Sequence, residues 1–395
     1  MPDNSTFKEL NSNSTLNELK RREAALKIIN SKIKEKDRSH LYDLTGLSGG
    51  FPIKREDIEL LETYAGPAVF EEDLQVQGKK HLGGEKILAL NRTSSGILAS
   101  ILALVKPGEE VVHYLPQLPS HPSIPRSLEL VGAKYSEFDD LNQLKIGDNT
   151  VLVVITGSTM DHQVMREEDF LKIVEISKSH DALVLVDDAS GARLRTVIYH
   201  QPRAMDMGAD LVITSTDKLM DGPRGGLLSG RADLVDLIKS KAHQFGLEAQ
   251  PPLIVGMVRA LENFDPERII NAQNEVKEIY GALRKDLEEI KKTPTGIMLS
   301  SEGLIKELKG RDVETPLNPF EVANILAMII LREYGIITIP AVGMPGASPT
   351  IRIDLASKDS ERLDHNYIVE AFNGSFSTLI ETIDNEKGWK EILYG

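Results

Sequence analysis

Two aspartates and a lysine stand where short apolar runs of the sequence end. The run Val184-Leu-Val-Asp-Asp-Ala-Ser-Gly191 carries Asp187 and Asp188, and the run Leu211-Val-Ile-Thr-Ser-Thr-Asp-Lys218 carries Lys218 before a glycine-rich stretch. Open α/β sheets bind ligands beyond the carboxyl ends of such strands. In pyridoxal-phosphate enzymes a lysine holds the cofactor as a Schiff base and a carboxylate keeps its pyridine nitrogen protonated. Taken alone, a lysine at a strand end is more often a surface residue.

A stretch of small hydroxyl residues offers a binding site for a phosphate group. Asn91-Arg-Thr-Ser-Ser-Gly-Ile97 lies between a predicted strand and a predicted helix over Ser95–Val105. Backbone N–H groups and the helix dipole favour an anion at such a junction. An ordinary Ser/Thr helix cap is the alternative. Because no Walker sequence and no GxGxxG motif follows a strand, nucleotide binding lacks its usual motifs.

A flat side chain after the next strand would cover one face of a cofactor ring. The segment Pro116-Gln-Leu-Pro-Ser-His-Pro-Ser-Ile-Pro125 follows the strand Val111–Leu115, and we select His121 for this role. Tyr114 and His113 are competing candidates. A histidine that caps a helix or lies on the surface is the alternative interpretation of His121.

An arginine near the C-terminus has the chemistry to bind a substrate carboxylate. Arg352 lies among apolar residues in Ser348-Pro-Thr-Ile-Arg-Ile-Asp354. A guanidinium matches a carboxylate with two parallel hydrogen bonds, so Arg352 is a candidate for an amino-acid carboxylate. An exposed arginine on an edge strand is the alternative.

The elements that must position these residues alternate between strands and helices after residue 85. This order predicts α/β units around a mostly parallel sheet. The predicted strands are Lys86–Ala89, Val111–Leu115, Lys134–Glu137, Val151–Thr156, Ala182–Val186, Leu211–Ser215 and Gly226–Ser229. The predicted helices between them are Ser95–Val105, Ser123–Val131, Glu167–Ser179 and Ala232–Lys241.

The remaining sequence predicts a smaller α+β domain after a long connecting helix. Prolines 251 and 252 open helical patterns over Val258–Asn263 and Glu267–Lys291, and a strand pattern follows Thr293. The further predicted elements are a helix over Pro319–Tyr334, strands over Ile336–Pro340 and Thr350–Asp354, and a helix over Leu363–Asp384. We therefore expect three segments: residues 1–40 as a tail and helix, 41–265 as a large cofactor-binding domain, and 266–395 as the connecting helix and small domain.

The N-terminal segment is polar at first and then basic. Residues 1 to about 17 offer too little apolar surface to offset the entropy of ordering, which predicts a disordered tail. From Leu16 to about Lys36, apolar residues recur at helical spacing beside a basic face, which predicts an amphipathic helix ending near His40. A solvated helix packed on the protein or on a partner subunit is favoured over contact with nucleic acid.

The composition narrows the class of protein. The chain has 395 residues, a net charge of −14 and no cysteine. Disulfides, thiolate zinc sites, iron–sulfur clusters and a cysteine nucleophile are thus excluded. The negative charge gives no general attraction to nucleic acid or anionic lipid. Because no signal peptide or long apolar span is present in the sequence, we expect a cytoplasmic protein without a membrane partner.

These motifs, in this order, resemble the fold-type I pyridoxal-phosphate enzymes of the aspartate aminotransferase superfamily, from about Leu41 to the C-terminus. The stretch Ser215-Thr-Asp-Lys-Leu-Met-Asp-Gly-Pro-Arg-Gly-Gly226 is similar to the lysine loop of bacterial selenocysteine synthase, L-seryl-tRNA(Sec) selenium transferase. It is most similar to that synthase's uncharacterised archaeal pyridoxal-phosphate-dependent relatives. Arg224 stands where the synthase loop has glutamine, and the phosphate junction also differs from that of the synthase.

The resemblance implies a cofactor, pyridoxal 5'-phosphate, and a role for each matching residue. Lys218 would be the Schiff-base lysine and catalytic base, and Asp187 the partner of the pyridine nitrogen. Arg352 would bind the substrate carboxylate. The other cofactor-binding residues implied are Ser94, Ser95 and Gly96 at the phosphate, Ser215 beside it, Ala189 beneath the ring and His121 stacked on it. A homodimer or larger homo-oligomer is implied as well.

The expected activity is elimination or replacement at the β or γ carbon of an amino acid. Selenium or sulfur transfer onto an aminoacyl-tRNA is the alternative, although we do not expect specific tRNA binding. A non-catalytic regulatory protein that retains the cofactor fold is a third hypothesis. Pocket shape decides which bond breaks, and sequence motifs do not define it.

Overall fold

The computed structural model describes residues 15–47, 50–343 and 348–395. Most of the expected N-terminal tail, residues 1–14, therefore lies outside the described residues. The chain forms two compact units. The sheet unit is Leu47–Ile269, and the terminal unit combines the residues up to Gly46 with Ile270–Gly395. These boundaries differ from the expected ones at residues 40 and 265, and they place the N-terminal helix in the same unit as the C-terminal segment.

The sheet unit contains a seven-stranded sheet in the order β2-β8-β7-β6-β5-β3-β4. Strand β8 is antiparallel to both neighbours, and the other pairings are parallel, which confirms the mostly parallel sheet. The strands are β2 Lys86–Leu90, β3 Glu110–Tyr114, β4 Lys134–Phe138, β5 Thr150–Thr156, β6 Leu183–Asp187, β7 Leu211–Ser215 and β8 Gly226–Gly230.

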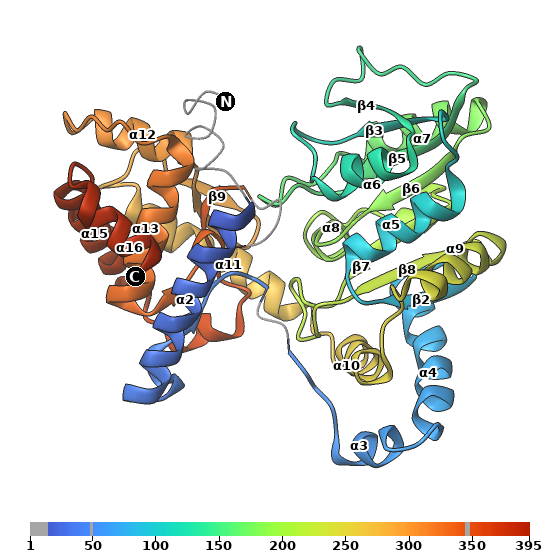
Figure 1. Cartoon of the computed structure of the whole chain (residues 1–395), viewed down its shortest axis with the longest axis horizontal. Helices are drawn as coiled ribbons and strands as arrows, with labels where there is room; N and C mark the ends of the chain where they lie inside the picture. Colours follow the sequence, from blue (N-terminus) through green and yellow to red (C-terminus); the bar gives the residue numbers. More distant parts are fainter. Residues whose placement is uncertain (1–14, 48–49, 344–347) are drawn as a thin grey trace, which may run out of the picture. The chain divides into compact units, whose positions relative to one another are not determined.

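Helices cover both faces of this sheet, as Figure 1 shows. On one face α5, α6 and α9 bury apolar side chains such as Ile97, Leu128 and Ile238 against the strands. On the other face α4, α7 and α10 contribute side chains such as Phe70 and Phe170. Burial of each such side chain stabilises the fold by roughly 1.5–3 kcal/mol relative to exposure. The helices are α3 Arg55–Leu61, α4 Ala65–Leu82, α5 Thr93–Leu104, α6 Ser123–Val131, α7 Glu167–Ser179, α8 Gly191–Arg193, α9 Ala232–Phe245 and α10 Pro251–Glu262.

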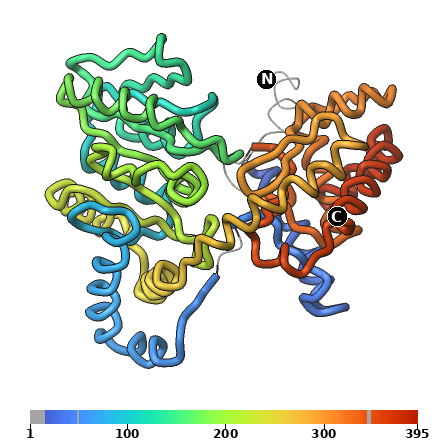
Figure 2. The backbone as a smooth tube through the Cα atoms, turned by 180° about the vertical axis from the view of Figure 1, so that it is seen from behind, coloured from blue at the N-terminus to red at the C-terminus, as the bar shows by residue number. Residues whose placement is uncertain are grey.

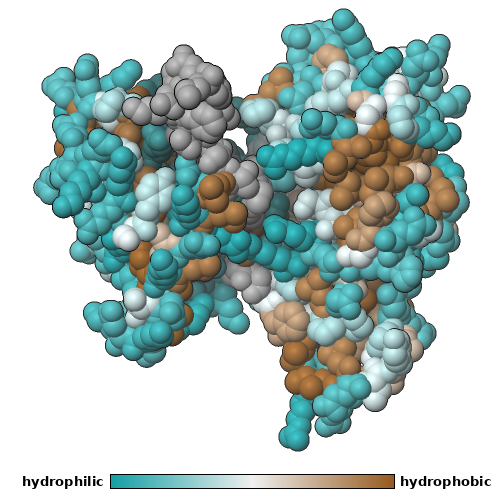
Figure 3. Space-filling view, in the orientation of Figure 1, coloured by the Kyte–Doolittle hydropathy of each residue, from teal (hydrophilic) through white to brown (hydrophobic). Residues whose placement is uncertain are grey.

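Apolar side chains also remain on the outside of the α5 face. Figure 3 shows them gathered where Figure 1 draws α5. Leu98 and Leu102 of α5 are half-buried, while Leu130 on α6 and Leu237 on α9 are largely exposed. An apolar surface of this kind is typical of an interaction site.

The terminal unit is built around helix α13, whose residues from Val322 to Leu331 are all buried. In Figure 2 its N-terminal helix is blue and its C-terminal segment runs from orange to red. The N-terminal helix α2 packs on α13, α14 and α16. Strands β12, β10 and β9 form a small antiparallel sheet in that order, and β1 pairs in parallel with β11.

The terminal unit's elements are α2 Thr15–Lys36, β1 Tyr42–Asp43, α11 Glu267–Leu283, β9 Lys291–Thr293, β10 Gly296–Leu299, α12 Ser301–Lys309, α13 Pro319–Tyr334, β11 Ile336–Ile337, α14 Ile339–Val342, β12 Ile351–Asp354, α15 His365–Thr382 and α16 Glu386–Tyr394, with α11 beginning in the sheet unit. Among the described helices, none is both long and apolar enough to cross a membrane.

Two predicted elements of the terminal unit are wrong. The long helix ends at Leu283 rather than Lys291, because Arg311 binds the Asp286 carbonyl and the chain turns to bury Leu287 and Ile290. The strand predicted over Ile336–Pro340 stops at Ile337, and α14 follows. Proline has no N–H for a sheet ladder but is suited to the first turn of a helix.

Candidate active site

The carboxyl ends of β5, β6 and β7 bring the predicted catalytic residues together. Thr156 of β5 pairs in register with Asp187 of β6, and β7 follows beside it. Because side chains alternate along a strand, Asp187 lies on the face that Leu185 shares with α5, α6 and α9. Ser215 lies on the same face, two residues after the buried Ile213.

Lys218 lies on the loop that follows β7 and is half-buried, whereas the residues around it are buried. The next residue, Leu219, has a φ of +56°. Such a conformation is strained for a branched residue and marks a loop whose shape is imposed by its surroundings. The Thr216 hydroxyl donates to the Pro223 carbonyl at 2.7 Å and closes this loop.

Asp187 is a carboxylate with an oxygen that lacks a donor. Its Oδ1 is shielded from solvent and has no hydrogen-bond partner among the described residues. Burial raises the pKa of Asp187 to about 6, and the positive charge of Lys218 acts in the opposite direction. An acceptor of this kind suits a protonated pyridine nitrogen, because the pair would satisfy both groups.

Asp188, by contrast, has partners within the fold. Its carboxylate forms an ion pair with Arg195 at 3.2 Å, and both side chains are fully enclosed. Arg195 also donates to Gln201 Oε1 at 2.7 Å and lies over the ring of Phe170. Removing one member of a buried pair leaves the other charge unpaired at a cost of about 3–5 kcal/mol. The role of Asp188 is therefore structural.

A second buried arginine ties the lysine loop to α8. Arg193 donates to Thr214 Oγ1 and lies 3.6 Å from the Met220 sulfur. Burial lowers its pKa to about 10. The hydroxyls of Thr214 and Ser215 both donate to the Ala189 carbonyl, at 3.2 and 3.4 Å. The residues predicted beside the phosphate and beneath the ring are thus neighbours.

The first turn of α5 contains Ser94, Ser95 and Gly96. No side-chain cap is formed by Arg92, the residue before the helix. An alanine Cβ at Gly96 would lie 2.1 Å from Ile213 Cδ1, so this turn packs directly on β7. Helix N–H groups without a capping side chain, close to Ser215, are suitable donors to a phosphate.

The three candidates for ring stacking have different surroundings. His113 is fully buried and Tyr114 is buried with its hydroxyl on the Asp139 carbonyl. His121 is half-buried, and its Nδ1 accepts a hydrogen bond from Ser123 N at 3.2 Å at the start of α6. This contact is the capping arrangement considered above, and stacking by His121 remains a prediction.

Arg352 lies on β12 in the terminal unit and is not an exposed edge-strand residue. Its side chain is 2 % exposed and donates to the Thr45 carbonyl at 3.1 Å. Neighbouring Asp354 is fully buried. The structure therefore corrects the alternative of a solvent-exposed arginine.

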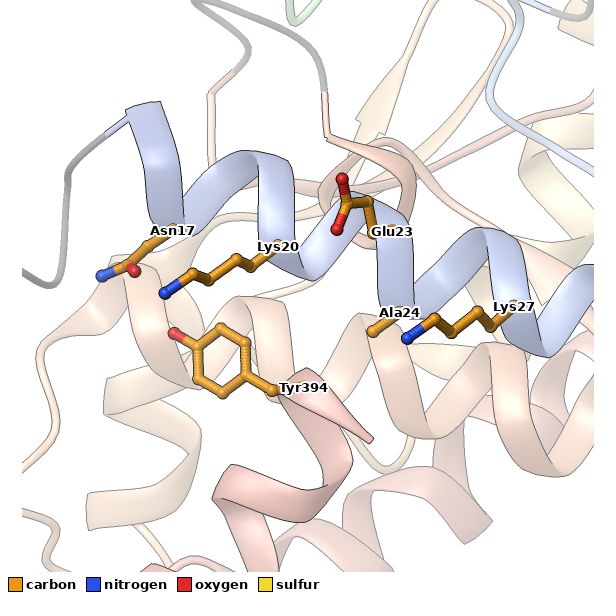
Figure 4. A pocket seen from close by; sticks show the side chains of 6 residues that line it. All are labelled: Asn17, Lys20, Glu23, Ala24, Lys27 and Tyr394. Atoms are coloured by element: carbon orange, nitrogen blue, oxygen red, sulfur yellow. The ribbon is translucent and has the colours of Figure 1, made fainter.

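Two cavities lined by described residues do not include Lys218 in their lining. One of about 630 Å³ in the sheet unit is bordered by Tyr114 and Pro116, which lead towards His121. The other, about 470 Å³, lies in the terminal unit between α2 and Tyr394. Figure 4 shows Lys20 and Lys27 along its edge.

Sequence reasoning did not identify Arg193 and Arg195. The only signal was two arginines in Gly191-Ala-Arg-Leu-Arg195, directly after the paired aspartates. Arginines so near a strand end also occur on surfaces. Their burial became evident only from the packing of α7 and the lysine loop.

Comparison with solved structures identifies the fold. YbdL from Escherichia coli, described as having a methionine aminotransferase function, superposes with a TM-score of 0.58 at 15% identity, covering 92% of this chain and 98% of that chain. A pyridoxal-phosphate-dependent aminotransferase from Streptococcus suis superposes equally well, at 0.58 and 15% identity, covering 91% and 98%. The chain therefore has the fold-type I architecture.

Comparison with known sequences identifies the family. An L-seryl-tRNA(Sec) selenium transferase of Mannheimia succiniciproducens is 23% identical, covering 77% of this chain and 64% of that protein. The model of the UPF0425 C-terminal domain matches residues 286–364. A UPF0425 pyridoxal phosphate-dependent protein of Methanothermobacter thermautotrophicus is 52% identical over 380 residues, 96% of this chain and 99% of that protein. With this identity over nearly its whole length, the chain belongs to the UPF0425 family of pyridoxal phosphate-dependent proteins.

Proposed function

We propose that the protein is a pyridoxal-phosphate-dependent enzyme that catalyses elimination or replacement at the β or γ carbon of an amino acid. The observation that carries the proposal is the unpartnered Oδ1 of Asp187 in the field of Lys218. An acceptor without a donor is costly in a folded protein unless a ligand supplies the donor. The resident residues thus fit the cofactor of the family.

The residues of the sheet unit would hold the cofactor at four points: its ring nitrogen, its phosphate, the two faces of its ring and its aldehyde carbon. Asp187 would accept the proton of the ring nitrogen. The N–H groups of Ser94 and Ser95, with the Ser215 hydroxyl, would bind the phosphate. The Gly96 N–H donates to the Arg92 carbonyl at 3.2 Å, so Gly96 would serve this site by letting the turn lie close to β7. Ala189 would lie beneath the ring and His121 over it. Lys218 would form the covalent link to the cofactor aldehyde.

Once bound, the cofactor would supply an electron sink for a carbanion at the substrate α carbon. The Lys218 amine would remove the α proton, because its loop lies at the same strand edge as Asp187. Arg352 would orient the substrate through its carboxylate. A leaving group on the β carbon would then depart with its bonding electrons, whereas departure from the γ carbon would first require removal of a proton from the β carbon.

Selenium or sulfur transfer onto an aminoacyl-tRNA is the second candidate, and the 23% identity to the selenium transferase favours it. Exposed Lys20, Lys27 and Lys34 on α2 give it a basic surface. The net charge of −14 opposes general attraction to RNA. A regulatory protein that binds the cofactor without catalysis is the third candidate. The apolar surface around α5 supports the expectation of a homo-oligomer, which remains a prediction.

Borohydride reduction of the protein with pyridoxal phosphate should place a pyridoxyl group on Lys218. We expect Lys218→Ala to lose this label and to lower turnover by roughly 100-fold or more, the usual contribution of a general base. Peptide mapping by mass spectrometry is the measurement. Lys239→Ala, at a partly exposed lysine on α9, is the control and should keep the label. Labelling of another lysine would reject the assignment.

The raised pKa of Asp187 predicts a pH dependence in the protein freed of cofactor. The folded state binds the proton more tightly than the unfolded chain, so this stabilisation is complete below pH 4 and is lost as the pH rises through about 6. Asp187→Asn should abolish that part of the dependence and weaken cofactor binding. Denaturant midpoints between pH 4 and 7.5 measure it. A slope that the variant retains would contradict the assignment.

Arg352→Lys should weaken amino-acid binding by about 10- to 100-fold, because lysine cannot form the bidentate pair. Titration of amino acids against the spectrum of the bound cofactor measures this, while the Lys218 label should be unchanged. Since Arg352 is buried, thermal unfolding must be measured in parallel. Arg284→Lys, at an exposed site of the same unit, is the control. An unaltered titration would remove Arg352 from the site.

We expect weak, unspecific tRNA binding. Because α2 packs on α13, α14 and α16 within the terminal unit, removing the helix would expose apolar side chains that it covers. Substitution of Lys20, Lys27 and Lys34 by glutamine is therefore the better test. The measurement is tRNA affinity against salt, where each single-strand phosphate contact contributes a logarithmic slope of about −0.7. Tight, tRNA-selective binding that the triple variant loses would favour the transferase alternative.

A further inference from the structure

The loop that carries Lys218 has a strained backbone directly beside the lysine. Leu219, the next residue, has a φ of +56° and is buried, and Met220 after it is buried as well. A branched residue in the left-handed region is strained, so contacts from outside the loop must keep it there. If Leu219 relaxed to a negative φ, the backbone that carries Lys218 would turn. The restraints on the residues around Leu219 therefore contribute to the position of the Lys218 amine.

Arg193 of α8 contacts the chain on both sides of Lys218. Its Nη1 donates to the hydroxyl of Thr214, which lies before the lysine at the end of β7. Its Nη2 lies 3.6 Å from the sulfur of Met220, which follows the lysine. Arg193 is 4 % exposed, and Thr214 and Met220 are also buried. One guanidinium thus links the end of β7 to the strained part of the loop.

The partners of Arg193 are unusual for a buried charge. Among the described residues no carboxylate forms an ion pair with it, and a thioether is only a weak acceptor. Burial lowers the pKa of Arg193 to about 10, while the charges of Asp188 and Asp217 act in the opposite direction, so it stays charged at neutral pH. An apolar side chain of similar volume would fill the same space without the cost of burying a charge. Packing alone therefore does not account for an arginine here, whereas two directional contacts around the lysine do.

We propose that Arg193 is a positioning residue that holds the lysine loop in its strained conformation and so places the Lys218 amine for attachment to the cofactor aldehyde. The inference rests on the proposed function of Lys218. In that attachment the amine adds to the aldehyde carbon and water leaves, so a C=N bond replaces the C=O bond and neither group is oxidised or reduced. Arg193 contributes by restricting the loop before the reaction and need not touch the cofactor.

Arg193→Met should separate positioning from folding. Methionine is apolar and flexible enough to fill the space, and the Thr214 hydroxyl keeps its own acceptor, the Ala189 carbonyl. We therefore expect the denaturant midpoint of the protein without cofactor to stay unchanged or to rise. Pyridoxal phosphate should nevertheless react with Lys218 roughly tenfold more slowly, the worth of one hydrogen bond. Borohydride quenching at timed intervals, followed by peptide mapping, measures this rate.

Two further variants assign the effect to the contacts around Lys218. Arg193→Lys keeps a charged donor but lacks the planar fork that reaches two acceptors, so its rate should lie between those of the unsubstituted protein and Arg193→Met. Met220→Leu removes the sulfur with little change in volume and should slow the reaction by about threefold, the effect of a weak hydrogen bond. Combined with Arg193→Met it should add nothing further, because both variants remove the same contact.

Arg259→Met is the matched control, at a partly buried arginine of α10. Arg259 forms ion pairs with Asp57 at 2.6 Å and with Glu262 at 2.8 Å. Loss of these pairs leaves the buried Asp57 carboxylate without its partner, so the control should lower the denaturant midpoint and leave the rate at Lys218 unchanged. Hydrogen exchange without cofactor should be faster at residues 216–222 in Arg193→Met and unaffected there in the control.

Failure of this inference can be separated from failure of the proposed function. If borohydride labels another lysine in the unsubstituted protein, the proposed role of Lys218 is wrong, and the inference falls with it. If Lys218 is labelled at the same rate in the unsubstituted protein and in Arg193→Met, the proposed function stands and Arg193 has no positioning role. A lower midpoint in Arg193→Met together with an unchanged rate in Met220→Leu would also overturn the inference, because Arg193 would then serve folding alone.

Discussion

The arrangement of residues at the carboxyl edge of the sheet depends on one unfavourable free-energy term. Asp187 Oδ1 is shielded from water and has no hydrogen-bond partner among the described residues. A buried charge without full hydrogen bonding is unfavourable; among the described residues, the charge of Lys218 and the Ala189 N–H favour the charged form of Asp187. Folding by itself does not require a shielded Asp187 oxygen that lacks a hydrogen-bond donor. The partial compensation leaves room for one further donor, which the ring nitrogen of the family's cofactor would supply in the proposed function.

Alternation along the chain gives the two adjacent aspartates different roles. Asp187 is the last residue of β6 and lies on the α5 face of the sheet, whereas Asp188 turns into the fold and pairs with Arg195, which lies over Phe170 of α7. The Asp188 carboxylate therefore has its partner within the protein, and this pair holds the end of β6 rigid. The Asp187 carboxylate is held on that rigid strand end, and its Oδ1 remains available to a hydrogen-bond donor from a ligand.

The sequence alone predicts the strands and the meeting of Asp187 with Lys218, because apolar runs ending in polar residues locate the carboxyl edge of a parallel sheet. It does not reveal that Asp188 is paired, because its partner comes from a short π-helical turn at Leu194–Ile198. The early end of α11 is equally hidden, since a tertiary bond from Arg311 to the Asp286 carbonyl decides it. The burial of His113 requires its partners on β4 and β5 to be known.

Close backbone approach, rather than charge, places the proposed phosphate-binding turn of α5 beside the lysine loop. Strand β8 lies between β2 and β7, so α5, which follows β2, must pass over β8 to reach β7. An alanine Cβ at Gly226 would lie 2.6 Å from the Arg92 carbonyl oxygen, and one at Gly96 would collide with Ile213. Glycine at both positions lets the start of α5 lie against the sheet. The same fold thus provides backbone donors at one end of the site and an unpaired acceptor at the other, with Lys218 on the loop beside them.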